Sequence, residues 1–235
     1  MNKALKNSFV GLAAVGGIGA LAAGYALAVR PWHLRWGATD EEVGAALPGD
    51  EVKPDADVSV THAITIDAPP PVVWQWLVQI GQDRGGFYSY DWIENLFDLE
   101  IHNTQEIKPE WQTLKVGDFV RSAHTRWLGG KYIDKTGWFV VRMEEDRALV
   151  LRDEIEQGSW AFILKPLGET KTRLIIRARG GKPANLPMKF VHYGFFEPAH
   201  FIMERKMLLT LKKRAEEFSV DHTSEGELQL TAEKI

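Results

Sequence analysis

Apolar and polar residues alternate along the second half of the chain. In residues 159–166, Trp160, Phe162 and Leu164 fall on one face, and a period of two residues predicts a β-strand with one buried side. The same alternation predicts four more strands here, at 118–125, 137–144, 147–154 and 171–180. In the last of these, the arginines lie opposite the apolar positions. The pattern therefore predicts an antiparallel sheet with one face in water.

A strand followed by a helix precedes these strands. Residues 58–67 alternate in the same way, with His62 on the apolar face. Three prolines then follow Ala68, and proline is accepted in the first turn of a helix. The apolar spacing from Val72 to Ile80 is helical and predicts a helix there. A short helix is predicted through Phe97.

Two helical segments close the folded part, starting near Pro187 and Pro198, and the second is predicted to be long and to end near Phe218. The whole order is strand, helix, short helix, about five strands and a long helix. It predicts an α+β domain of the helix-grip type, in which a curved antiparallel sheet wraps around the C-terminal helix. Because the sheet curves away from the helix, we expect an apolar cavity between them.

The first part of the chain predicts a membrane anchor. An uncharged, mostly apolar run extends from Asn7 to Val29 and is long enough to span a bilayer, so residues 1–30 are predicted to be one transmembrane helix. The residues Ala26-Leu27-Ala28 also fit a signal-peptide cleavage site. Basic residues flank both ends of the run, so its orientation stays open.

Three further regions follow from the pattern. Residues 31–57 are predicted to be a juxtamembrane linker, with a short helix after the capping-box sequence Thr39-Asp40-Glu41-Glu42. Residues 58–218 form the predicted helix-grip domain. Residues 219–235 are polar and acidic and predict a disordered tail.

Composition and the absence of known motifs argue against several classes of function. The 235 residues carry a net charge of −4 with no basic stripe, which argues against a nucleic-acid partner. The absence of cysteine excludes disulfides and thiolate chemistry. There is no phosphate-binding glycine loop, no Gly-x-Ser-x-Gly and no zinc-ligand spacing, so we predict no cofactor and no metal. The oligomeric state stays open.

Several motifs resemble the SRPBCC superfamily, also called the START or Bet v 1-like superfamily. The resemblance is carried by residues 63–69 leading into Val73-Trp74, by residues 76–82, by the block Arg84-Gly85-Gly86-Phe87-Tyr88-Ser89-Tyr90-Asp91-Trp92, by Val116-Gly117-Asp118 and by residues 197–208. It covers roughly residues 38–218 and implies a helix-grip fold with a ligand cavity. The last block is similar to a bacterial membrane-anchored subgroup, which implies an inner-membrane location. No reaction is implied, because the superfamily holds transporters, cyclases, hormone receptors and oxygenase subunits.

Candidate ligand contacts are the aromatic and polar residues that such a cavity would collect. The glycines and rings of residues 83–91 are suited to close a cavity mouth, or an ion pair of Arg84 with Asp83 or Asp91 pins this loop. His62 is either a hydrogen-bonded core residue or a polar anchor in the pocket. The predicted set is His62, Trp74, Phe87, Tyr88, Tyr90, Trp160, Phe162, His200, Phe201 and Glu204.

Glu197, His200 and Glu204 are spaced so that they line one face of the last helix. A carboxylate-bridged metal site would need a second such motif on another helix, and the sequence has none. Glu197 is expected instead to cap the helix and to pair with a nearby base.

Three functions stay in competition. The preferred one is a membrane-tethered binding protein for an apolar small molecule or lipid, because the predicted fold forms a pocket and no catalytic constellation stands out. The second is a cyclase, dehydratase or isomerase that uses His62 with Tyr88 or Asp91. The third is a non-catalytic partner-binding module, assembled through the small residues Gly16, Ala20 and Gly24 of the anchor.

Overall fold

The computed structural model describes residue 20 and residues 23–131, 135–155 and 157–232, with side chains as far as Val220. The strands are β1 (Val58–Ile66), β2 (Phe119–Arg121), β3 (Gly137–Glu144), β4 (Ala148–Asp153), β5 (Ser159–Leu167) and β6 (Lys171–Gly180). The α-helices are α2 (Arg30–His33), α3 (Asp40–Gly44), α4 (Pro70–Leu77), α5 (Asp91–Leu96), α6 (Leu186–Val191) and α7 (Glu197–Ala232). Short π- and 3-10 helices are η1 (Tyr25–Val29), η2 (Asp50–Val52), η3 (Pro109–Trp111), η4 (Trp127–Gly130) and η5 (His192–Phe196).

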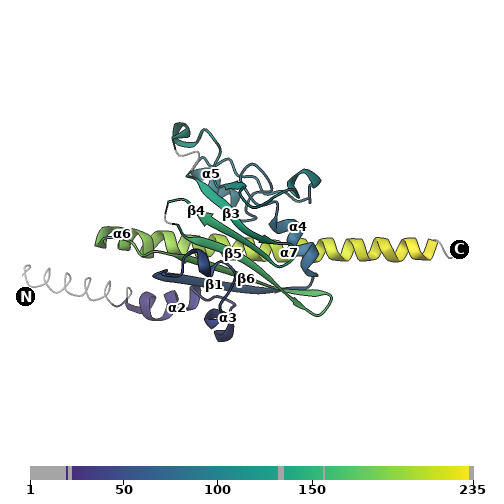
Figure 1. The fold of residues 1–235 in the computed structure, drawn as a ribbon, viewed down its shortest axis with the longest axis horizontal. Helices are drawn as coiled ribbons and strands as arrows, with labels where there is room; N and C mark the ends of the chain where they lie inside the picture. The colour runs from purple at the N-terminus through teal and green to yellow at the C-terminus, as the bar shows by residue number, and fades with distance from the viewer. Residues whose placement is uncertain (1–19, 21–22, 132–134, 156, 233–235) are drawn as a thin grey trace, which may run out of the picture.

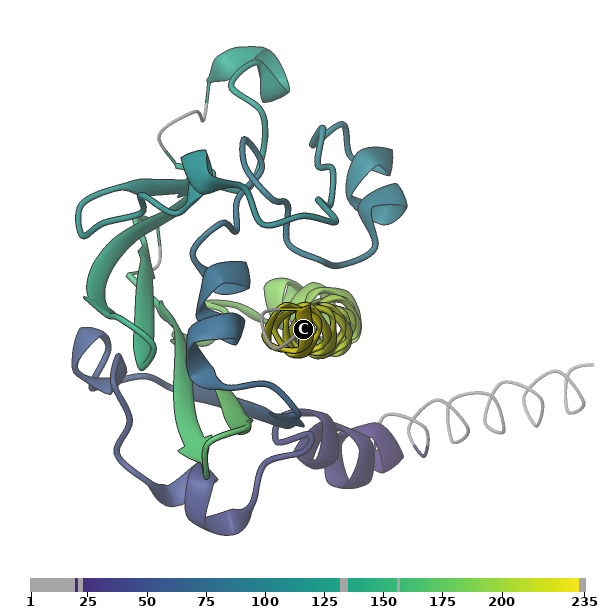
Figure 2. The same ribbon diagram turned by 90° about the vertical axis from the view of Figure 1, so that its right-hand side faces the viewer.

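The strands form one antiparallel sheet, in the order β1-β6-β5-β4-β3-β2. Figure 1 shows the long helix α7 running along this sheet, and Figure 2 looks down α7 with the sheet curving around one side of it. The predicted α+β fold with a covering C-terminal helix is therefore confirmed. β3 and β6 have the predicted bounds, whereas β2 is shorter than predicted.

Most of the predicted anchor lies outside the described residues. Among the residues that are described, no helix combines the length and the apolar character that crossing a bilayer requires.

The inner face of the sheet and α7 bury one apolar core. The register aligns His62 with Ile176 and Ile176 with Phe162 across β1, β6 and β5, so side chains in this row point the same way. All three are at most 1% exposed. Met207 and Leu208 of α7 pack in the same cluster. Burial of this apolar surface holds the helix on the sheet.

The outer face of the sheet is also covered, which corrects the predicted solvent-facing side. Arg177 on β6 is 2% exposed. Its guanidinium donates to the carbonyls of Glu42 and Val43, and it pairs with Asp50 at 3.2 Å. Alternation of arginines looks like a wet face in sequence, but here the residues 31–57 supply the acceptors that a buried guanidinium needs.

Residues 31–57 pack as part of the folded domain. The carbonyls of Leu34 and Trp36 accept hydrogen bonds from β1. Gly37 has a φ of +73°, and a Cβ there would lie 2.1 Å from the carbonyl oxygen of Ala63, so this close approach requires glycine. The predicted capping box is confirmed, with the Thr39 hydroxyl accepting from the Glu42 N–H at 3.1 Å.

A small apolar cluster lies beneath this covering segment. It consists of Leu47, Ala63, Val150, Ala161, Ile163 and Ile175. The sheet is thus the middle of three layers.

The sequence predicts that two separate helices begin near Pro187 and Pro198. In the structure, α6 and α7 are instead joined by η5. Proline lacks an N–H and crowds the preceding turn, and the wider π-helical stretch just before it accommodates the ring. Helix α7 is assigned as far as Ala232, whereas its side chains are described only to Val220. The disordered tail at 219–235 stays a prediction.

Replacing Arg177 by leucine should destabilise the protein by about 3 kcal/mol, because Asp50 and the carbonyls around the guanidinium lose their partner. Urea unfolding of the full chain in detergent measures this change. Arg126→Leu is the matched control, since this side chain is 80% exposed and should leave the unfolding free energy nearly unchanged. Equal effects of the two substitutions would contradict a structural role for the covering segment.

Candidate functional site

A buried carboxylate, Glu204 on α7, is the centre of the polar groups inside the fold. Its Oε1 lies 2.6 Å from Nδ1 of His62 on β1. Its Oε2 accepts from Nε1 of Trp160 on β5 at 3.0 Å and lies 3.1 Å from Nε2 of His200. Glu204 is 3% exposed and His62 1% exposed. One carboxylate therefore joins two strands and the long helix.

His62 contacts Glu204 through one ring nitrogen and the main chain through the other. Its Nε2 lies 2.6 Å from the main-chain oxygen of His33, and because a carbonyl only accepts, Nε2 carries a hydrogen. Nδ1 then faces Oε1 of Glu204, so the imidazole ring bridges the buried carboxylate and the main chain of His33.

The charge states of Glu204 and His200 follow from their contacts. Burial alone would raise the pKa of Glu204, but the hydrogen bonds from His200 and His62 outweigh it and hold the pKa well below its usual range. For His200, desolvation opposes the charged ring, but the hydrogen bond and charge of Glu204 raise its pKa. The side chain of His200 remains 53% exposed, so it is the member of the group that meets solvent.

An ion pair of Arg30 with Glu197 lies at the start of α7, seven residues before Glu204. Arg30 binds Glu197 through two hydrogen bonds of 2.9 Å, which confirms the predicted pairing of Glu197 with a base. Nε2 of His33 lies 3.5 Å from Glu197 and 3.0 Å from the hydroxyl of Tyr25. The start of α7 is therefore tied to the end of the N-terminal helical segment. Glu197 lies inside a continuous helix, so the predicted cap is wrong.

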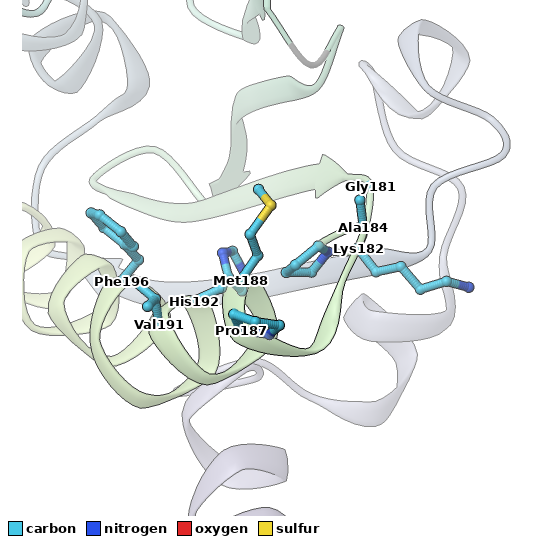
Figure 3. Close-up of a pocket in the computed structure, with 9 residues that line it drawn as sticks. Gly181, Lys182, Ala184, Pro187, Met188, Val191, His192 and Phe196 are labelled. Carbon is cyan, nitrogen blue, oxygen red and sulfur yellow. The ribbon is translucent and has the colours of Figure 1, made fainter.

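A hollow of about 720 Å³ lies beside α6. Figure 3 shows its lining side chains on α6, η5 and the loop after β6, with Lys182 at the opposite end of the group from Phe196. The lining residues are Gly181, Lys182, Pro183, Ala184, Pro187, Met188, Val191, His192 and Phe196. Most of them are apolar, as is usual for a small-molecule site.

The hollow lies outside the predicted cavity. Phe162, Ile176 and Met207 belong to one buried apolar cluster between the inner face of the sheet and α7. None of the predicted ligand residues lines the hollow. The cavity between sheet and helix therefore stays a prediction.

The hollow and the buried carboxylate lie on one face of the helix. Phe196, His200 and Glu204 follow one another at four-residue spacing, which places them in a row. Phe196 lines the hollow, His200 is half exposed and Glu204 is buried. His200 is thus the polar group between the hollow and the carboxylate.

Seven of the predicted site residues form one connected group in the structure. Phe201 packs on His62 with ring centroids 5.5 Å apart. The ring centroid of Trp160 lies 6.3 Å from that of Phe87 and 4.7 Å from that of Phe162. The group is His62, Phe87, Trp160, Phe162, His200, Phe201 and Glu204.

The other three predicted residues have separate surroundings. Trp74 is buried in the core. The Tyr88 hydroxyl donates to the carbonyl of Trp76 and accepts from Gln79, and burial raises the Tyr88 pKa. Tyr90 precedes α5, with Lys206 over its ring. Tyr88 is therefore occupied within its own part of the fold.

The proposed enzymatic use of His62 with Tyr88 or Asp91 finds no convergent geometry among the described residues. His62 is bonded to Glu204 and His33, and the Asp91 carboxylate accepts from the N–H of Trp92. The alternative ion pair of Arg84 is also wrong: Arg84 donates to the carbonyls of Val78 and Trp111.

Sequence reasoning missed His33, the Arg30 partner of Glu197 and the lining of the hollow. His33 acts through its main-chain oxygen, which no side-chain pattern reveals. The hollow had one signal: the helix that follows Gly180-Gly181-Lys182-Pro183 has apolar residues on more than one side.

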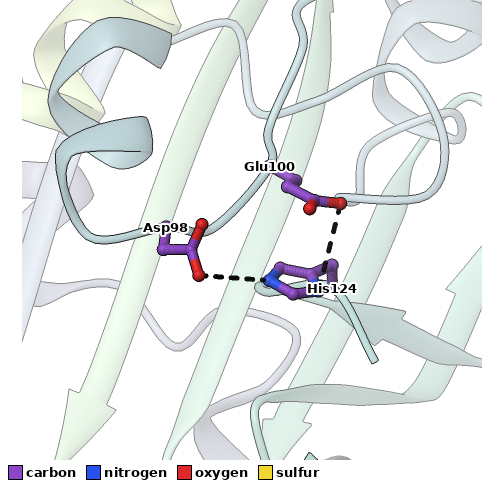
Figure 4. A group of neighbouring side chains, drawn as sticks. All are labelled: Asp98, Glu100 and His124. Atoms are coloured by element: carbon purple, nitrogen blue, oxygen red, sulfur yellow. Dashed lines mark ion pairs between the residues drawn. The ribbon is translucent and has the colours of Figure 1, made fainter. Parts of the chain in front are cut away.

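Asp98, Glu100 and His124 form a group that can be tested as a metal site (Figure 4). Asp98 lies 3.8 Å from Nε2 and Glu100 3.9 Å from Nδ1 of the same ring, so the carboxylates face different nitrogens. The N–H of Arg126 donates to Nδ1, and its guanidinium lies 3.3 Å from Glu100. Because Nδ1 already accepts a hydrogen bond and the two carboxylates share no ring nitrogen, we interpret this group as a surface cluster held by the Arg126–Glu100 ion pair.

No family model and no curated protein matches the sequence. Solved structures give weak likenesses. CalC from Micromonospora echinospora, described as a self-sacrificing resistance protein, is 13% identical with a TM-score of 0.44, over 69% of this chain and 97% of that one. The Polyketide_cyc-like protein Cgl2372 from Corynebacterium glutamicum is 18% identical with a TM-score of 0.31, over 73% and 93%.

A third likeness is to the Aha1 dimer from Colwellia psychrerythraea, 16% identical with a TM-score of 0.38 over 68% of this chain and 96% of that one. Scores this low carry no argument. The fold class rests instead on the strand order and the covering helix α7, which agree with the helix-grip fold that the SRPBCC resemblance predicts.

Replacing Glu204 by glutamine should destabilise the protein by about 3 kcal/mol, because a neutral amide cannot replace the charge-assisted hydrogen bonds that the buried carboxylate makes with His62, Trp160 and His200. Urea unfolding gives the value. Glu217→Gln, on the exposed side of the same helix, is the control and should change little. An unfolding free energy that Glu204→Gln leaves unchanged would show that the buried carboxylate contributes nothing to stability.

The pKa of His200 should lie above 6.5 in the native chain and fall in Glu204→Gln. Since the folded-state pKa is raised, the stabilisation it brings is complete below about pH 6.5 and is lost as the pH rises through the folded-state value. The reverse holds for Glu204, whose contribution is lost as the pH falls below about 4.3 towards its lowered pKa. NMR titration of ¹³C-labelled histidines measures His200, assigned with His200→Asn. A curve unchanged in Glu204→Gln would disprove the coupling.

Proposed function

We propose that this protein binds an apolar small molecule, with lipid as the leading class, in the hollow beside α6, and that its N-terminal run tethers it to a membrane. The observation that carries the proposal is the apolar hollow, whose lining residue Phe196 lies on the same helix face as the half-exposed His200 and the buried Glu204.

The chemistry of the hollow supports a ligand with an apolar body and one polar end. Pro187, Met188, Val191 and Phe196 offer apolar contact, and a volume of about 720 Å³ is in the range of small-molecule sites. A charged His200, held by Glu204, suits a carboxylate, phosphate or hydroxyl on the ligand. The buried pair beneath it keeps the ring oriented.

The membrane tether is supported by the apolar run of residues 7–29. The end of this run is Arg30, which binds Glu197 one turn before His200. A tether at this place would hold the hollow beside the bilayer, where apolar molecules are most concentrated.

Filling the hollow should remove the bound molecule. Native mass spectrometry of the full chain, released from detergent, is expected to show an apolar adduct on the native protein and none on Val191→Trp, because the indole would occupy the ligand volume. The matched control is Val116→Trp, since Val116 is also exposed and does not line the hollow. An adduct retained equally by both variants, or absent from the native chain, would argue against the proposal.

A further inference from the structure

We infer that the helical segment Leu186–Phe196, called here the lipid-facing rim, lies in the headgroup region of a membrane as a second contact beside the N-terminal run. The partner is the bilayer surface, and the rim would open the hollow towards acyl chains. This inference shares the membrane setting of the proposed function but needs no bound ligand.

The rim exposes an unusual amount of apolar surface. Six of its side chains are between 52% and 73% exposed: Leu186, Met188, Phe190, Val191, Phe195 and Phe196. Single exposed apolar residues are ordinary, but a contiguous group of large ones marks an interaction surface. Aromatic and aliphatic side chains on a surface helix are also what an interfacial membrane helix presents.

The rim is held firmly and is not a loose segment. The side chain of Asn185 accepts from the N–H of Met188 at 3.0 Å and caps α6. At its other end, η5 continues directly into α7. An apolar face on a fixed helix has no means of turning inward, so it requires an outside partner.

The path of the N-terminal segment indicates which partner this is. Arg30, at the end of the apolar run, binds Glu197 and lies 4.8 Å above the ring of Tyr193 in η5. Trp32 follows and is 55% exposed, as suits a ring at a membrane interface. Figure 1 shows α2 and α6 at the same end of the molecule, away from the C-terminal end of α7. A chain leaving the bilayer at Arg30 places the rim at the bilayer surface.

The charge of the rim agrees with a membrane. Between Glu169 and Glu197 the sequence contains no acidic residue. Lys189 lies within the rim, and Lys182, which lines the hollow, pairs with Asp57 at 2.8 Å. Lysines near apolar side chains favour anionic lipid headgroups. A second copy of this chain would also cover the apolar face, but it would not explain why the rim lies beside the end of the apolar run.

The absence of native cysteine allows a clean test with single labels. Phe190→Cys and Phe195→Cys each receive an NBD fluorophore, in the full chain reconstituted into phosphatidylglycerol–phosphatidylcholine vesicles. Leu167→Cys is the control, because Leu167 is exposed on the β5–β6 hairpin, at the end of β6 that lies away from α6.

Both rim labels should emit at shorter wavelength than the control and should lose emission when the vesicles contain nitroxide lipids. The control label should show neither change. Rim labels that behave like Leu167→Cys would overturn the inference. A second result would also overturn it. If the rim labels emit at short wavelength but nitroxide lipids do not quench them, and unlabelled Phe190→Cys chains cross-link to each other, then a second copy of the chain covers the rim. Retention of the adduct in native mass spectra tests the ligand separately.

Discussion

The contact of the buried Glu204 carboxylate with His62 is the constraint on which the arrangement of the molecule depends. A carboxylate with so little exposure is stable only when its partners are in place, and its partners come from β1, β5 and the preceding turn of α7. Apolar packing alone would tolerate a shift of the helix along the sheet. The buried hydrogen bonds of Glu204 fix one position, and with it the directions in which Phe196 and His200 point.

The same physical requirement shapes the other face of the sheet. A guanidinium as buried as that of Arg177 needs several acceptors, and residues 42–50 supply them through main-chain carbonyls and one carboxylate. The segment that leads from the apolar run into β1 is thereby part of the fold. Its position is in turn tied to Glu197 through Arg30. The two faces of the sheet are linked through one continuous stretch of chain.

These constraints place the open surface of the protein at one end. Buried side chains form one apolar core between sheet and helix, and exposed apolar side chains gather on α6 and η5 beside the hollow. The π-helical stretches η1 and η5 both end at the residues of the Arg30–Glu197 pair. Such wide turns are frequent at functional sites, and here His192 and Phe196 of η5 line the hollow. The proposed ligand site and the proposed membrane contact therefore share one end of the molecule.

The sequence by itself determined the sheet and the covering helix, because periodicity records which side of an element is buried. It did not determine the partner of His62, which lies 142 residues away, or the cover over Arg177. A pattern of alternating apolar and polar residues predicts that the polar ones face solvent, so a buried arginine such as Arg177 is predicted to be exposed. The hollow depended on tertiary structure alone, since free volume is decided by how side chains from distant segments fill space.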